Sequence, residues 1–122
     1  MAYDEYIADR ISNVLKQKNY DFIAKRMMGG LCFMVDDKML CGTHFDKKLE
    51  KDLLMLRVGP DNYEMALERS HCIPMTFTGR SMKGYVFVEP LGFDQDEDLE
   101  FWIKLCLDFN PLAKSSKKKK KT

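Results

Sequence analysis

The hydrophobic positions near the start of the chain follow the spacing of an amphipathic helix. Apolar side chains recur at intervals of three and four residues from Tyr6 to Leu15, and polar residues fill the positions between them. Acidic residues come early in this stretch and lysines come late, which suits the dipole of a helix. The pattern predicts a helix over residues 4–18 that ends near Asn19.

A second pattern, with apolar residues at most positions, runs from residue 31 to residue 45. Asp36-Asp37 interrupts it, which predicts a β-hairpin of residues 31–35 and 38–45 around a two-residue turn. Both faces of this hairpin are apolar, so we expect it to lie in the interior of a sheet. The two-residue turn predicts three cross-strand pairs, which are Val35 with Lys38, Phe33 with Leu40, and Cys32 with Cys41.

The segments on either side of this hairpin give weaker signals. Residues 20–28 fit either a short strand or an extended lead-in, and Gly29-Gly30 interrupts them. The charged residues 46–52 predict a connection, and the apolar residues 53–58 predict a third strand.

The second half of the chain returns to a helical spacing and then to strands. Pro60 lies near the first turn of a helix predicted over residues 61–69. Residues 74–78 and 85–89 predict two strands, joined by a loop from Gly79 to Gly84.

The last predicted element is a helix with an apolar stripe from Leu99 to Leu107. Asp94, with Glu97 three residues later, has the spacing of a capping box and predicts the start of this helix. Pro111 predicts its end.

The predicted order is α-β-β-β-α-β-β-α, with an optional extra strand near residues 22–28. Short connections favour antiparallel pairing, so we expect an α+β fold. It would be a two-layer sandwich with a mainly antiparallel sheet of about five strands and two to three helices. The 122 residues fit one domain, over residues 1–112, followed by a disordered lysine-rich tail over residues 113–122.

The charge is distributed unevenly along the chain. Six lysines lie in the last ten residues, and removing their charges from the net charge of +1 leaves −5 for the rest. Such a tail fits either an electrostatic contact with nucleic acid or an acidic protein, or a simple solubility tag. No aromatic residue is interleaved, so the tail would bind without discriminating between bases. The candidate electrostatic residues are Lys117, Lys118, Lys119, Lys120 and Lys121.

The segment from Gly79 to Gly84 is the main candidate for an anion-binding or partner-binding site. Arg80 and Lys83 supply two cations, and the glycines Gly79 and Gly84 would let the backbone approach an anion closely. The alternative is an ordinary hairpin loop whose glycines serve turn geometry and whose charges face water.

Other classes of function find little support in the sequence. No motif of a hydrolase, kinase or phosphate-binding loop is present, so we expect neither enzymatic activity nor a cofactor. His44 and His71 lack the ligand spacing of a zinc site. The chain has no apolar run of membrane-spanning length and no signal peptide, so we expect a cytoplasmic protein without a membrane partner. We therefore expect reduced, structural thiols at Cys32, Cys41, Cys72 and Cys106.

Three segments of the chain, at residues 27–39, 56–60 and 74–86, together match a known pattern. The pattern has a Met-Phe-Gly-Gly run, an Arg-Val-Gly segment, and a Phe-Thr-Gly-Arg-Pro-Met-Lys-Gly-Trp run. This chain differs at Met28 in place of Phe, Ser81 in place of Pro, and Tyr85 in place of Trp. It resembles the N-terminal domain of the TfoX (Sxy) family of bacterial competence regulators, and the resemblance covers roughly residues 5–110.

This resemblance implies an α+β fold and a regulatory role. Long members of the family carry a second domain and help to activate DNA-uptake genes alongside a cAMP-responsive transcription factor, whereas this chain resembles a stand-alone member. The first hypothesis is therefore a non-enzymatic binding module that contacts protein, within the transcription machinery, with nucleic acid as a further partner through the tail. The alternatives are a small-ligand or anion-binding protein that uses the Gly79–Gly84 loop, and a homodimer formed through an apolar sheet face.

Overall fold

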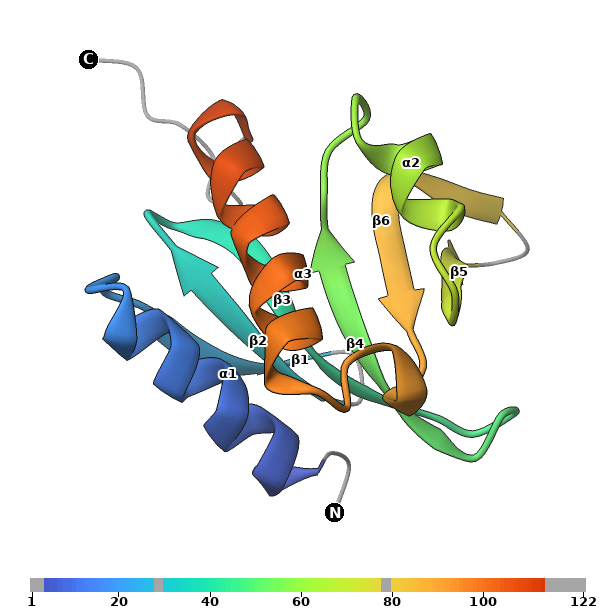
Figure 1. Cartoon of the computed structure of the whole chain (residues 1–122), viewed down its shortest axis with the longest axis horizontal. Coiled ribbons are helices and arrows are strands. Elements are labelled where there is room, and N and C mark those ends of the chain that lie inside the picture. Colours follow the sequence, from blue (N-terminus) through green and yellow to red (C-terminus); the bar gives the residue numbers. More distant parts are fainter. Residues whose placement is uncertain (1–3, 28–29, 78–79, 114–122) are drawn as a thin grey trace.

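A six-stranded antiparallel sheet with helices on one face forms the fold of the chain (Figure 1). The structure is a computed structural model that describes residues 4–27, 30–77 and 80–113. The strands lie in the order β1-β2-β3-β4-β6-β5. They are β1 (Ile23–Met27), β2 (Gly30–Val35), β3 (Lys38–Asp46), β4 (Lys51–Arg57), β5 (Cys72–Phe77) and β6 (Arg80–Val88).

The helices of the described residues confirm the predicted two-layer α+β sandwich. They are α1 (Glu5–Gln17), α2 (Tyr63–Leu67) and α3 (Asp96–Phe109), with short 3-10 turns η1 (Pro90–Gly92) and η2 (Asn110–Leu112). α1 and α3 lie side by side across the sheet in Figure 1, and their apolar stripes join the main core. None of these helices has both the length and the apolar character needed to cross a bilayer.

The two faces of the sheet carry separate apolar clusters. The helix-side core contains Phe33, Leu56 and Trp102, all at most 1% exposed. The opposite face carries a second cluster of buried side chains, made of Cys32, Met34, Leu53, Met55, Met75 and Phe87. This arrangement explains why β2 and β4 are apolar at successive positions rather than alternating, since both of their faces are buried.

The β2–β3 hairpin confirms the predicted turn but not the whole register. Asp36 and Asp37 have φ of 55° and 62°, as a type I′ turn requires, and Val35 pairs with Lys38. Beyond Met34 the prediction is wrong, because Leu40 is an extra residue that forms a bulge in β3. Phe33 therefore pairs with Cys41 instead of Leu40, and Cys32 pairs with Gly42 instead of Cys41.

Several predicted boundaries need correction. The connection predicted over residues 46–52 is shorter, at residues 47–50, because Asp46 of β3 pairs with Lys51 of β4. Within the ambiguous stretch 20–28, residues 23–27 form β1. α2 spans only residues 63–67 rather than 61–69. The capping box at Asp94 is wrong: α3 begins at Asp96, Gln95 is its N-cap, and no side chain caps it.

The predicted loop from Gly79 to Gly84 is also wrong, because Arg80 to Gly84 belong to strand β6. Arg80 pairs with Phe77 of β5, and the chain continues as a strand to Val88. Gly84 has a φ of 95°, which glycine adopts at little cost inside an irregular strand. Gly84 thus marks an irregularity inside β6, although the sequence predicted that a strand begins after it.

Candidate functional site

Two of the three motif segments meet at one end of the sheet. The backbone N–H groups of Val58 and Gly59 both donate hydrogen bonds to the carbonyl oxygen of Gly84, at 2.9 and 3.0 Å. A Cβ on Gly84 would lie 3.4 Å from the carbonyl carbon of Gly59. The Arg-Val-Gly segment and the Met-Lys-Gly-Tyr segment are therefore in direct backbone contact.

Gly59 also packs against the C-terminal end of α3. Its φ is 89°, and a Cβ at this position would come within 2.4 Å of the ring of Phe109. Only glycine satisfies both the left-handed backbone and the close approach of the ring. The glycine thus has a structural reason for its place in the motif.

An arginine joins these segments through aromatic contacts. Arg57 faces Tyr85 across the β4–β6 pair, and its guanidinium carbon lies 5.5 Å from the centre of the Tyr85 ring. The same carbon lies 5.8 Å from the centre of the Phe109 ring. Both distances fit cation–π contacts, which orient the guanidinium between two rings. We call these five residues the motif cluster: Arg57, Gly59, Gly84, Tyr85 and Phe109.

The β2–β3 turn reaches the same end of the molecule. Lys38 Nζ donates to the carbonyl oxygens of Asn110 and Pro111, at 3.1 and 3.4 Å, and so caps the C-terminal end of α3. Asn110 Nδ2 donates to the carbonyl oxygen of Val35 at 3.2 Å. The described chain ends three residues later, at the buried Ala113, so the lysine-rich segment starts beside this turn.

Three of the predicted site residues, Arg80, Lys83 and Gly84, lie within the described part of β6. Arg80 is the first residue of β6, Lys83 is exposed, and Gly84 is buried in the motif cluster. Gly79 and the tail lysines, Lys117 to Lys121, lie outside the described residues. Because Tyr85 pairs with the last residue of β4, Arg80 and Lys83 extend beyond β4 at the end where the motif cluster lies.

Sequence reasoning missed four members of this cluster as site residues. Arg57, Gly59 and Tyr85 lay inside the quoted motifs, so a signal for them existed. Phe109 has the sequence pattern of one more apolar residue of a helix, and its contacts with Gly59 and Arg57 appear only in the structure.

The charges at this end are mixed rather than uniformly positive. Asp36 and Asp37 of the turn are exposed beside Lys38, whose ammonium is engaged by carbonyl groups. On the β6 side, Lys83 is exposed and carries a positive charge, and the lysine-rich segment follows Ala113 in the sequence. An anionic partner is therefore expected on the β6 side of the motif cluster and away from the turn.

The four cysteines have the character of structural thiols. Cys32 and Cys41 fall in different cores, on opposite faces of the sheet, which argues against a redox pair. Burial raises the pKa of Cys32 to about 11 and that of Cys72 to about 11. Burial also raises the pKa of Cys41 and of Cys106, so these thiols are weak nucleophiles at neutral pH.

The histidines do not form a metal centre with the cysteines. The ring of His44 stacks on Phe87, with centroids 5.3 Å apart and planes 4° apart, on the face away from Cys41. In the ranges that the structure describes, no three His, Cys, Asp or Glu side chains are grouped to hold a metal ion.

Comparison with known proteins identifies the family of this fold. Residues 17–110 match the TfoX N-terminal domain, a span from the end of α1 through α3 that includes all three motif segments. The fold is thus that of a small α+β module in which two of the three motif segments meet at one end. The chain belongs to the TfoX N-terminal domain family. No curated protein and no solved structure gave a match.

Proposed function

We propose that this protein is a non-enzymatic regulatory module of the cytoplasm that joins a transcription complex and contacts nucleic acid there. The observation that carries the proposal is the meeting of the family motifs at the end of the sheet where the lysine-rich segment begins. Membership of the family supports a regulatory role, and the mixed charge at this end limits the contact to the β6 side.

The overall charge distribution suits such a contact. The chain without its six tail lysines carries a net charge of −5, which repels phosphate from most of the surface. A cationic segment at one end would orient the molecule with the motif cluster toward the nucleic acid. Arg80 and Lys83 would then bind backbone phosphates next to the lysine tail, with no contact to base edges.

The alternative of an anion site in a Gly79–Gly84 loop loses its structural premise. Residues 80–84 are a strand whose glycine contacts Gly59 rather than an open cradle of N–H groups. The cations of this strand therefore serve an extended surface better than a pocket for a small anion.

Fluorescence anisotropy with a labelled DNA duplex tests the proposal. Full-length protein, a truncation after Ala113, and the double variant Arg80→Ala/Lys83→Ala would be titrated at several salt concentrations. We expect both changes to weaken binding, because each removes phosphate contacts, and to lower the steepness of the salt dependence. Removal of two phosphate contacts should reduce the slope of log K against log salt by about 2.

A matched control comes from the opposite end of the sheet. Lys47 and Lys48 are exposed in the turn between β3 and β4, so Lys47→Ala/Lys48→Ala removes the same charge from the other end. Equal weakening by the two double variants would show only a general charge effect. If Arg80→Ala/Lys83→Ala leaves binding unchanged, the folded body makes no phosphate contact and the nucleic-acid part of the proposal is wrong.

A further inference from the structure

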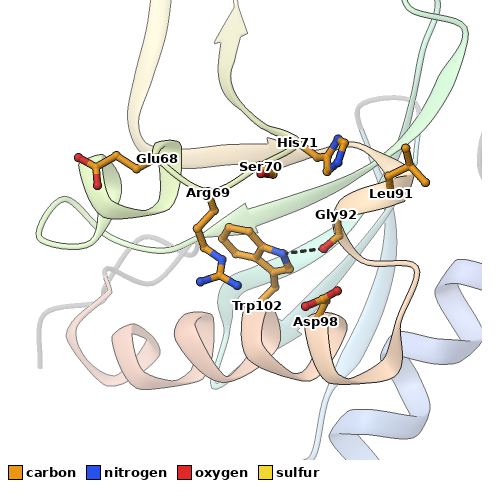
Figure 2. Close-up of a pocket in the computed structure, with 8 residues that line it drawn as sticks. All are labelled: Glu68, Arg69, Ser70, His71, Leu91, Gly92, Asp98 and Trp102. Atoms are coloured by element: carbon orange, nitrogen blue, oxygen red, sulfur yellow. Dashed lines mark hydrogen bonds between the residues drawn. The ribbon is translucent and has the colours of Figure 1, made fainter.

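A second feature lies at the opposite end of α3 from the motif cluster. A hollow of about 370 Å³ opens between the end of α2, the turn η1 and the first turns of α3 (Figure 2). This volume is within the range of sites for small molecules. The lining residues are Glu68, Arg69, Ser70, His71, Leu91, Gly92, Asp98 and Trp102.

The indole of Trp102 forms a fixed wall of this hollow. Trp102 is 1% exposed, and its Nε1 donates a hydrogen bond to the carbonyl oxygen of Gly92 at 3.1 Å. Gly92 is tightly packed in turn, since a Cβ there would lie 2.4 Å from Val88 Cγ1 and 3.0 Å from His71 Cβ. The wall therefore needs little rearrangement to receive a ligand.

Arg69 supplies an oriented cation on one side of this wall. Its guanidinium carbon lies 4.0 Å from the centre of the Phe101 ring and 5.6 Å from the centre of the Trp102 ring. Among the described residues, no carboxylate is within 4.0 Å of this guanidinium. Stacking on the rings fixes the planar group and leaves its edge of N–H donors available to an anion.

Asp98 supplies the opposite charge. It belongs to the first turn of α3, and Figure 2 shows its carboxylate and the guanidinium of Arg69 on either side of the Trp102 indole. The other acid of the lining, Glu68, points away from the indole in the same view. The hollow therefore presents one cation and one anion, separated by an aromatic wall.

We propose that this hollow binds a small zwitterion, with its carboxylate at Arg69, its ammonium at Asp98 and its carbon chain across the hollow between them. A simple anion would be repelled by Asp98, and a simple cation would be repelled by Arg69. A molecule that carries both charges satisfies both groups at once. This site is independent of the proposed nucleic-acid surface, which lies at the other end of the molecule.

A homologous series of amino acids tests the site and measures its length. The probes are glycine, β-alanine, γ-aminobutyrate and 5-aminovalerate, in which the two charges are progressively further apart. The readout is the indole N–H signal in a nitrogen-15 correlation spectrum, which is a single signal because Trp102 is the only tryptophan. We expect at least one probe to give a saturable shift, with a dissociation constant of about 1 mM or tighter.

Two variants and their matched controls decide whether the binding is the one proposed. Arg69→Gln and Asp98→Asn should each weaken the best probe tenfold or more, and acetate or methylammonium should bind at least tenfold more weakly than that probe. Lys104→Gln on the same helix and Glu97→Gln in the same helical turn should leave binding unchanged, since both side chains are exposed outside the hollow. The proposal is overturned if no probe gives a saturable shift, if the two variants bind as well as the wild type, or if acetate or methylammonium binds as tightly as the best probe.

Discussion

At the scale of single residues, the two motif glycines serve different needs although both have positive φ. Gly59 combines a φ of 89° with a ring contact, whereas a Cβ on Gly84 would meet its nearest atoms at an ordinary 3.4 Å. Gly84→Ala should therefore lower the free energy of unfolding by about 1 to 2 kcal/mol through the backbone alone.

Gly59→Ala should lower the free energy of unfolding further, by an additional 1 to 3 kcal/mol or so, because the new methyl group overlaps the Phe109 ring. Urea denaturation of the two variants beside the wild type measures both effects. Equal losses in Gly59→Ala and Gly84→Ala would contradict the contact between Gly59 and Phe109.

Thr43 is a residue whose replacement should stabilise the protein. Its side chain is 1% exposed, and its Oγ1 has no hydrogen-bond partner among the described residues. Thr43→Val keeps the shape and removes the desolvated hydroxyl, so the free energy of unfolding should rise by about 1 kcal/mol. Thermal denaturation checks this, and a lower melting temperature in Thr43→Val would show that the hydroxyl is satisfied in the folded protein.

At the scale of elements, the contact between the β2–β3 turn and α3 carries a prediction. Lys38→Met removes the ammonium that binds the carbonyl oxygens of Asn110 and Pro111 just after α3, and this should cost about 1 kcal/mol of stability. Lys104→Met is the matched control. Lys104 forms an exposed pair with Asp108 at 3.0 Å, and its loss should change stability by no more than about 0.5 kcal/mol. A larger loss in the control than in Lys38→Met would contradict the capping role.

Elements with a regular apolar period were predictable, and elements shaped by local irregularity were not. The stripes of α1 and α3 follow the helical spacing, so both helices were confirmed within two residues at each end. The bulge at Leu40 has no signature in the sequence. It arises because Leu40 and the next residue, Cys41, both pack into the helix-side core. The sequence placed Gly84 at the end of a loop, whereas the structure places it inside β6. A positive φ favours glycine both in a turn and inside an irregular strand, so the residue type alone does not distinguish the two.

The candidate site was only partly predictable for a related reason. The motifs named Arg57, Gly59 and Gly84 without showing that they touch, since the contact joins β4 and β6 through pairing over a long stretch of sequence. Neither the hollow beside Trp102 nor the stacking of Arg69 on Phe101 had any signal in the sequence. The hollow is formed by three segments that are separate in the sequence, namely the end of α2, the turn η1 and the start of α3.

At the scale of the whole molecule, the buried thiols predict how stability depends on pH. The pKa of Cys32 rises from 9.0 to about 11 on folding, so below pH 9 its thiol is protonated in both states. Above pH 9 the unfolded thiol ionises first, so the stability that Cys32 contributes is lost as pH rises toward 11. Between pH 8 and pH 10 this loss should be about 1.4 kcal/mol for Cys32.

The variant Cys32→Ala isolates this contribution from that of lysine and tyrosine side chains. Urea denaturation at pH 8 and pH 10 should show a smaller pH-dependent loss in the variant than in the wild type, by the amount given above. An identical loss in both proteins would show that Cys32 ionises as readily in the folded state as in the unfolded chain.

The two proposed binding surfaces lie at opposite ends of α3. The motif cluster and the start of the lysine-rich segment lie at its C-terminal end, and the hollow beside Trp102 lies at its N-terminal end (Figures 1 and 2). The region between them is the packed core, so each surface can be altered with little effect on the other.

The most direct test of the proposed function is to map the contact surface on the protein truncated after Ala113. A nitrogen-15 correlation spectrum would be recorded with and without a DNA duplex at low salt, so that the tail cannot contribute. The account predicts that the amide signals of Lys83 and Tyr85 shift, and that those of Lys47 and Lys48 at the other end of the sheet do not. Shifts confined to the end with Lys47 and Lys48, or no shifts at all, would contradict it.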